Sequence, residues 1–210
     1  MTIDPRASEI LETWFGPPGS DPLAQSAKWF RRDAAFDGEI RERLGVDIER
    51  AARGELDSWR RDGTDDERAR GALALVVLID QFSRNAFRDT PKAFAGDPYA
   101  LAVSLDAQKS GLAERLTHME RAFLMMPMEH SESREVQRDS VAAFDRLASD
   151  AEQHGAPEPV RKMITAFADY ARRHAAIVER FGRFPHRNAI LERASTPEEV
   201  EFLKQPGSSF

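Results

Sequence analysis

Cysteine is absent from this sequence of 210 residues. Its absence excludes a disulfide framework, a thiolate metal site and a cysteine nucleophile, and it is typical of a reducing compartment. Long apolar runs are missing as well, because the longest, Ala72 to Ile79, is far shorter than the roughly 20 residues that a membrane-spanning helix needs. The opening stretch MTIDPRASEI contains Asp4 and no apolar core, so it does not resemble a signal peptide. We expect a cytoplasmic protein that has no membrane partner.

An excess of positive charge is also lacking. The formal net charge is -6 and the sequence pI is near 5.5, whereas proteins that bind nucleic acid usually present a basic face, so we expect no nucleic-acid partner. The P-loop, dinucleotide-binding, zincin and α/β-hydrolase motifs do not occur. The acidic run Asp62 to Glu67 lacks the alternating ligand spacing of a calcium-binding loop. We therefore predict no cofactor and no metal site.

Signals for helix ends are dense in the chain, and strand alternation is nearly absent. Cap residues followed by a proline or a glutamate predict helix starts at Asp4-Pro5, Thr64 to Glu67, Thr90-Pro91, Asp97-Pro98, Thr117 to Glu120 and Ser195 to Glu199. The length and a hydrophobic content of 41% suit one domain that spans residues 1–210. We predict an all-α fold of about eight to ten helices packed in antiparallel pairs.

Two segments are predicted to lie at the core. Leu73 to Ile79 is apolar on every side, so a helix there should be buried all round. Val160 to Phe181 carries a stripe at alternating spacings of four and three, formed by Met163, Phe167, Tyr170, His174, Ile177 and Phe181. A lone histidine on such a stripe is more often a hydrogen-bonded core residue than a ligand. We therefore predict that His174 is buried.

Asp80-Gln-Phe-Ser-Arg-Asn85 is the first of three polar motifs and follows the core helix. Asp80 shares the buried stripe of that helix, and a lone buried carboxylate needs a partner. Arg84 lies four residues further on, where it can form an intrahelical pair if the helix continues. A structural Asp80–Arg84 pair is one interpretation. In the other, Asp80, Arg84 and Asn85 contact a ligand.

Met125-Met-Pro-Met-Glu-His-Ser131 is the second motif. Its three methionines are predicted to fill the core beside a helix that Pro127 breaks. Glu129 and His130 are candidates for metal ligands or for a catalytic acid–base pair. Adjacent residues on a helix point about 100° apart, so these two side chains converge only if the backbone there is irregular. Pro127 would provide that irregularity.

Arg180-Phe-Gly-Arg-Phe-Pro-His-Arg-Asn188 is the third motif. Gly182 is suited to end the preceding helix and Pro185 to begin the next one. Cations in the first turn of a helix oppose its dipole, so the motif predicts an anion there. The candidate ligand-binding residues are Arg183, His186, Arg187 and Asn188. In the structural alternative, Asp80 and Glu129 supply the compensating charge and form an internal network.

These motifs carry a resemblance to a known family. Together with Trp14-Phe15-Gly16 and Trp29-Phe30, the stretches 73–94, 123–132 and 180–199 resemble the bacterial family catalogued as domain of unknown function 924. The resemblance implies an all-helical fold similar to that of tetratricopeptide-repeat proteins, and it implies no activity. The family's DQFPRN has Ser83 in place of proline here, which leaves the helix freer to continue through Arg84.

Two functions are consistent with the motifs. The first is a binding module that holds an anionic small molecule or an acidic peptide terminus with Arg84, Arg183, His186, Arg187 and Asn188. The second is an enzyme, in which Glu129 or His130 acts as the general base, His186 acts as the acid, and Arg183 and Arg187 orient a carboxylate or phosphate. Both require the motifs to meet in space. We therefore expect direct contact between at least two of the three.

Overall fold

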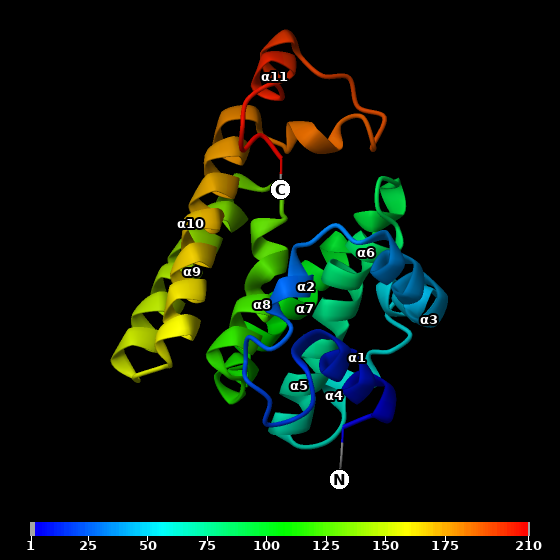
Figure 1. The fold of residues 1–210 in the computed structure, drawn as a ribbon, viewed down its shortest axis with the longest axis vertical. Helices are drawn as coiled ribbons and strands as arrows, with labels where there is room; N and C mark the ends of the chain where they lie inside the picture. The colour runs from blue at the N-terminus through cyan, green and yellow to red at the C-terminus, as the bar shows by residue number, and fades with distance from the viewer. Residues whose placement is uncertain (1–2, 210) are drawn as a thin grey trace.

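The computed structural model describes residues 3–209. Within that range the chain consists of helices and loops and contains no strand. In chain order (Figure 1) the elements are α1 (Pro5–Phe15), α2 (Ser26–Trp29), α3 (Ala34–Ala52), α4 (Ser58–Arg61), α5 (Asp65–Val76), η1 (Val77–Phe82), α6 (Ser83–Ala86), η2 (Pro91–Ala93), α7 (Asp97–Lys109), η3 (Leu112–Arg115), α8 (His118–Glu129), α9 (Arg134–Gln153), α10 (Glu158–Phe181), η4 (Pro185–Arg187) and α11 (Pro197–Phe202). The stretch from α5 through η1 to α6 is one continuous helix. Counting it once leaves ten α-helical segments among residues 3–209, and the predicted all-α class is confirmed.

Most of the predicted helix ends are confirmed. Asp4 caps α1, and its carboxylate accepts a hydrogen bond from the Arg6 backbone N–H. Reciprocal capping boxes begin α5, α8 and α11, each from a threonine to the glutamate three residues later. Gly182 ends α10 in the left-handed conformation, with a φ of 70°. These ends depend only on residues a few positions apart.

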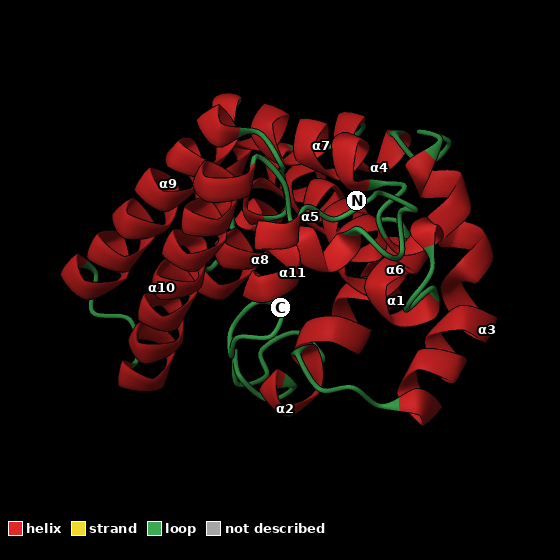
Figure 2. Ribbon diagram, turned by 90° about the horizontal axis from the view of Figure 1, so that it is seen from above, coloured by secondary structure: helices red, strands yellow, loops and turns green. Residues whose placement is uncertain are grey.

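The continuous helix 65–86 lies at the centre of the fold, as Leu73 to Ile79 predicted. Every residue from Leu73 to Ile79 has an exposed fraction of 0%. Helices α1, α3, α7 and α8 pack around it, and Figure 2 shows this group beside the longer α9 and α10. Burial on every side follows from the absence of any polar side chain between Leu73 and Ile79.

A second layer is formed by α9 and α10, which pack against each other and against α8. Figure 1 shows the segment after α10 (orange to red), which includes α11, at the top of the molecule. His174 is buried, as predicted, but Tyr170 on the same predicted stripe is 46% exposed. The spacing predicts the direction in which a side chain points, but at Tyr170 the surrounding chain leaves the ring partly exposed.

The prediction that Pro127 breaks its helix is wrong. Helix α8 continues through Pro127 to Glu129. The proline removes one backbone hydrogen bond near the last turn, and buried residues on both sides hold the helix in place. Met125, Met126 and Met128 are buried, which confirms their predicted role as core residues.

None of the helices within residues 3–209 combines the length and the apolar character that are needed to cross a bilayer.

The crossing of α4 over α5 gives a test of the core. A Cβ added to Gly71 would lie far inside the van der Waals radius of the Trp59 carbonyl, which is backbone and cannot rotate away. We expect Gly71→Ala to lower the free energy of unfolding by about 3 kcal/mol or more, because the two helices must separate. Urea denaturation measures this loss.

Gly45→Ala is the matched control. Gly45 lies inside α3, and an added Cβ meets no atom within 4 Å. Alanine there should raise the free energy of unfolding by about 0.5–1 kcal/mol, because glycine costs more backbone entropy in a helix. Equal effects of the two substitutions would contradict the close helix crossing.

Candidate functional site

The candidate site begins at η1, a π-helical turn within the continuous helix that carries Asp80. Such turns occur often at functional sites. The Asp80 carboxylate is fully buried. Its Oδ1 lies 3.1 Å from Arg84 Nη1 and 2.7 Å from His130 Nδ1, and its Oδ2 accepts a hydrogen bond of 2.6 Å from Gln81. The structure thus has the Asp80–Arg84 pair of the first interpretation, and the predicted direct contact between at least two of the three motifs is confirmed.

Burial by itself would raise the pKa of Asp80. The charges of Arg84 and His130 and the hydrogen bonds from His130 and Gln81 outweigh burial and hold the pKa below its usual range. Asp80 is therefore ionised at neutral pH and acts only as a hydrogen-bond acceptor.

Asp97 connects the third motif to the first. It lies in the first turn of α7 and binds Arg84 through both oxygens, at 3.1 and 3.0 Å. Its Oδ2 also lies 3.3 Å from Nη1 of Arg187. In the sequence, Asp97 is recognisable only as part of a helix start, where a polar residue beside proline is ordinary. Its role as the shared carboxylate of two arginines comes from the tertiary structure.

Arg187 is the one buried arginine among the described residues, with an exposed fraction of 6%. Its Cζ lies 4.8 Å from the ring centroid of Phe94 and 4.6 Å from that of Phe184. The contact of Nη1 with Asp97 is its one side-chain hydrogen bond to the described residues. Burial, and then the charge of Arg84, lower the pKa of Arg187 to about 10. The guanidinium therefore stays charged at neutral pH but is poorly compensated.

The Nε and Nη2 atoms of Arg187 make no hydrogen bond with the described residues, and Nε is fully buried. These two donors form the planar edge of a guanidinium that binds a carboxylate or a phosphate with two parallel hydrogen bonds. Three other arginines of this chain bind a carboxylate on the same edge: Arg60 binds Asp57, Arg88 binds Asp37 and Arg183 binds Glu199. Arg187 differs from them because it is buried and this edge is unfilled, which means that neither Nε nor Nη2 has a hydrogen-bond acceptor among the described residues.

Three histidines surround the two arginines. Burial, followed by nearby positive charges, lowers the pKa of His174 to about 3 and that of His186 to about 4. Burial and Arg84 also lower the pKa of His130, against the opposite effect of Asp80. All three imidazoles are therefore neutral at neutral pH. The His130 and His174 rings lie 6.0 Å apart.

Glu129 and His130 do not converge, contrary to the effect expected from Pro127. His130 contacts Asp80, whereas Glu129 Oε2 lies 3.5 Å from Nδ1 of His174. Glu129 is 4% exposed, and its Oε1 makes no hydrogen bond with the described residues. Burial and the nearby Asp80 carboxylate raise the pKa of Glu129 well above its usual value. A protonated, enclosed carboxyl group is poorly suited to act as a base at neutral pH.

Three of the predicted site residues lie in other contacts. Asn85 donates to Asp37, which also binds Arg88. Arg183 and Asn188 both contact Glu199, at 2.7 and 3.4 Å. The structure thus groups Asp80, Arg84, His130 and Arg187, with Glu129 and His186 beside them, and it separates Asn85, Arg183 and Asn188 from that group.

The turn that carries Arg187 also differs from the prediction. Pro185 begins only the three-residue η4, so no helix dipole faces the arginines. Carboxylates other than the expected Asp80 and Glu129 offset the positive charges of this segment: Asp97 contacts Arg187, Glu132 binds Arg193 at 2.6 Å, and Glu199 binds Arg183. These carboxylates lie in α7, in the loop between α8 and α9, and in α11, which sequence spacing does not relate.

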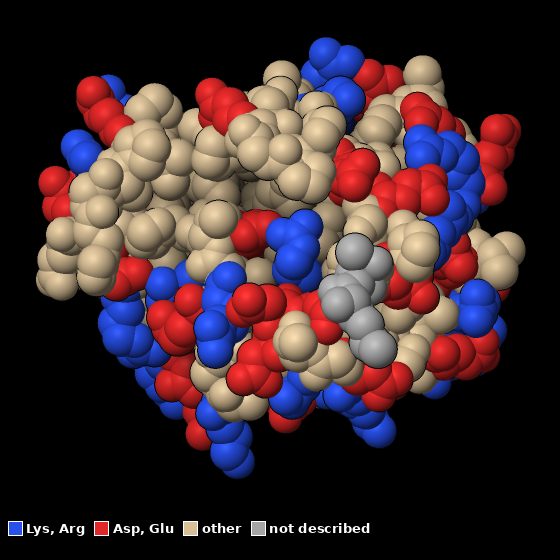
Figure 3. Space-filling view, turned by 90° about the horizontal axis from the view of Figure 1, so that it is seen from below, with Lys and Arg blue, Asp and Glu red and all other residues tan. Residues whose placement is uncertain are grey.

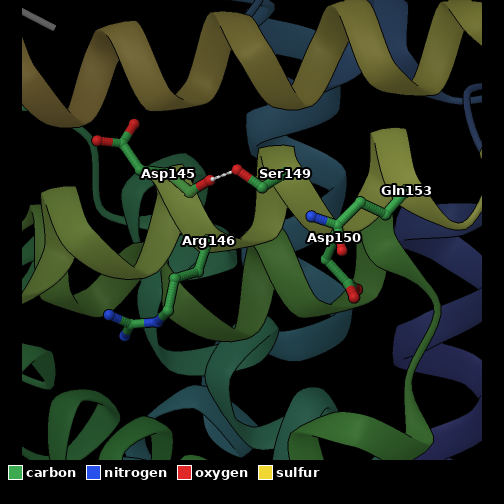
Figure 4. A pocket seen from close by; sticks show the side chains of 5 residues that line it. All are labelled: Asp145, Arg146, Ser149, Asp150 and Gln153. Atoms are coloured by element: carbon green, nitrogen blue, oxygen red, sulfur yellow. Dashed lines mark hydrogen bonds between the residues drawn. The ribbon is translucent and has the colours of Figure 1, made fainter.

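Surface features elsewhere are less specific. A shallow depression on α9 is lined by Asp145, Arg146, Ser149, Asp150 and Gln153 (Figure 4), and Ser149 donates to the Asp145 carbonyl. Figure 3 shows a face on which acidic and basic side chains are interleaved around an uncharged, hollowed area. No group of three or more metal-ligating side chains is found in residues 3–209. The buried arginine and its neighbours therefore remain the candidate site.

Comparison with known proteins identifies the family without an activity. The family described as "Bacterial protein of unknown function (DUF924)" matches residues 10–207. A solved structure of a protein of unknown function from Agrobacterium tumefaciens is similar to this chain, with 35% identity and a TM-score of 0.71, over 95% of this chain and 97% of that one. No curated protein matches the chain significantly.

The raised pKa of Glu129 predicts a pH-dependent effect of Glu129→Gln. In the folded protein Glu129 keeps a proton that the unfolded chain releases above its ordinary pKa of 4.5, so wild-type stability falls as the pH rises through that window. Glutamine removes this loss. The stability of the variant relative to the wild type should increase between about pH 5 and pH 8, by at most about 1.4 kcal/mol per pH unit.

Glu132→Gln is the control with the opposite sign. Burial alone would raise the pKa of Glu132, but Arg193 and the Phe184 N–H lower it. Its stabilising contribution is present above pH 4.5 and is lost as the pH falls through the folded pKa, so Glu132→Gln should destabilise most at neutral pH. Urea denaturation across the pH range measures both. A pH-independent effect of Glu129→Gln would show that Glu129 is ionised when folded.

Proposed function

We propose that this chain, which belongs to the bacterial family DUF924 of unknown function, binds the carboxylate or phosphate of a small molecule or of an acidic peptide terminus on the Nε–Nη2 edge of Arg187. The observation that carries the proposal is the buried guanidinium with this edge unfilled. Buried polar groups are nearly always hydrogen-bonded, so two unfilled donors on a buried cation point to a ligand.

The surroundings of Arg187 favour recognition over simple charge attraction. Phe94 and Phe184 hold the guanidinium plane, so little side-chain entropy is lost when an anion binds. Asp80 and Asp97 both contact Arg84, and Asp97 alone contacts Arg187, so the cluster already contains two carboxylates that oppose the binding of a further anion by charge alone. An incoming oxyanion would therefore be held by directed hydrogen bonds, and its binding should depend on geometry as well as on charge.

Arg84 has a positioning role in this proposal. Its donors bind Asp97 and the Asp80 carbonyl oxygen. Asp97 is thereby fixed on the Nη1 side of Arg187, which leaves the Nε–Nη2 edge available. Arg183, which binds Glu199, is instead proposed to hold the C-terminal segment.

Acid–base catalysis on the bound anion is a second candidate function. The observation that favours it is the hydrogen bond between His130 Nδ1 and the buried Asp80 carboxylate, an arrangement that orients an imidazole as a general base. His130 would remove a proton from the ligand or from a water molecule. Ligand turnover that Arg187 supports and His130→Phe abolishes would establish this function.

Arg187→Met tests the binding site directly. Methionine retains much of the apolar contact with Phe94 and Phe184 and removes a poorly compensated charge. Asp97 keeps its two bonds to Arg84. We expect the free energy of unfolding to stay within about 1 kcal/mol of wild type or to rise, since replacing a buried ionic group by an apolar one is often neutral or stabilising. Phosphate or carboxylate, added at constant ionic strength, should raise the thermal midpoint of the wild type and not that of the variant.

Arg183→Met is the matched control. It removes the guanidinium partner of Glu199, whose side chain is 2% exposed, and should cost about 3 kcal/mol or more. Stabilisation by anions should persist in this variant. The proposal is contradicted if Arg187→Met costs as much as Arg183→Met, or if no anion of the panel raises the wild-type midpoint.

A further inference from the structure

The protonation state of His130 determines whether its second ring nitrogen, Nε2, donates or accepts a hydrogen bond. Asp80 is an ionised, fully buried acceptor, so His130 Nδ1 must donate in the 2.7 Å contact between them. In a neutral ring the other nitrogen, Nε2, then carries a lone pair and no hydrogen. Nε2 makes no hydrogen bond with the described residues, and the His130 side chain is 16% exposed. It is therefore an accessible acceptor.

This acceptor lies beside the arginine donors. His130 Nδ1 and Arg84 Nη1 contact the same oxygen of Asp80, at 2.7 and 3.1 Å. Arg84 and Arg187 share Asp97, and both lie against the ring of Phe94.

The charged and titratable groups around His130 come from several elements: Asp80 and Arg84 from the central helix, Asp97 from α7, Glu129 from α8, His174 from α10, and His186 and Arg187 from η4. Burial and the cationic Arg84 lower the pKa of His130 and so disfavour a proton on Nε2, while the contact with Asp80 fixes the remaining proton on Nδ1. Contacts from His130 through Asp80, Arg84 and Asp97 to Arg187 thus bring the acceptor and the two unpaired donors of Arg187 into one cluster.

We infer that the ligand of this site is an oxyanion that also carries a hydroxyl group, so that Arg187 binds its anionic oxygens while its O–H donates to His130 Nε2. The inference rests on the proposed anion site at Arg187 and specifies its ligand class. Hydrogen phosphate and 2-hydroxycarboxylates share this chemistry. Sulfate and simple carboxylates are acceptors only, and they bring a lone pair against the lone pair of Nε2.

Matched pairs of anions test the inference on the wild-type protein. Orthophosphate carries a P–OH at neutral pH and sulfate carries none, and glycolate carries a hydroxyl that acetate lacks. Calorimetric titration at constant ionic strength compares the dissociation constants within each pair. We expect the hydroxyl-bearing member of at least one pair to bind about tenfold more tightly, since its O–H donates to Nε2 where the other anion brings a lone pair against it. The pair that shows the preference identifies the source of the hydroxyl.

His130→Leu identifies the residue that reads the hydroxyl. The variant should lose most of the preference within the pair, because the affinity for the hydroxyl-bearing anion falls to about that of its partner, while the weaker anion binds as before. Asp80 keeps Arg84 and Gln81 in this variant, and the thermal midpoint of the variant reports whether it folds. If it does not fold, the anion pairs on the wild type decide the question alone.

The possible outcomes separate the two proposals. Equal affinities within both pairs, tighter binding of sulfate than of phosphate, or an unchanged preference in a folded His130→Leu variant would overturn the inference while leaving the anion site at Arg187 intact. Absence of binding by all four anions would overturn the anion site, and the inference would fall with it.

Discussion

A buried carboxylate at the end of the central helix organises the polar groups of this protein. Asp80 is fully enclosed, and a buried charge without partners would cost several kcal/mol. Arg84 compensates this charge from within the same helix, and His130 donates a hydrogen bond to it from the end of another helix. The helix must therefore continue past the π-helical turn to Arg84, and α8 must end where His130 reaches Asp80. The need to pair the buried Asp80 carboxylate therefore fixes where these two helices lie relative to each other, and with them the position of the candidate site.

The chain uses arginine in two ways. Arg60, Arg88 and Arg183 have their planar edges filled by carboxylates, as expected of groups that fix one segment to another. Arg187 is more buried than any of them and leaves that edge unfilled between two phenylalanine rings. Such an arrangement lowers stability in the absence of a ligand, and it is the kind of local cost that proteins retain at functional sites. The neutral imidazole of His130 lies in the same cluster and is bound through Nδ1 to Asp80.

The sequence alone determined the features that depend on neighbouring residues. Capping boxes, helix ends at glycine and the all-round burial of Leu73 to Ile79 follow from spacings of a few residues, and the structure has each of them. The Asp80–Arg84 pair belongs to this class, because four residues along a helix fix the distance between side chains. The same reasoning failed at Tyr170 and at Pro127, where packing by other elements decides whether a side chain is covered and whether a helix survives a proline.

Only the tertiary structure decided which charges meet. Arg187 and Asp97 are 90 residues apart, and Arg193 and Glu132 are 61 residues apart, so no spacing in the sequence pairs them. The sequence shows where an arginine is. Whether a carboxylate binds its guanidinium, or one edge of the guanidinium stays without a partner, depends on the path of the backbone around it. Electrostatic partners have no period along the chain, whereas helix caps and apolar stripes do. For this reason contact between at least two of the three motifs could be predicted, whereas only the fold shows that Arg187 binds Asp97 while Arg183 and Asn188 bind Glu199.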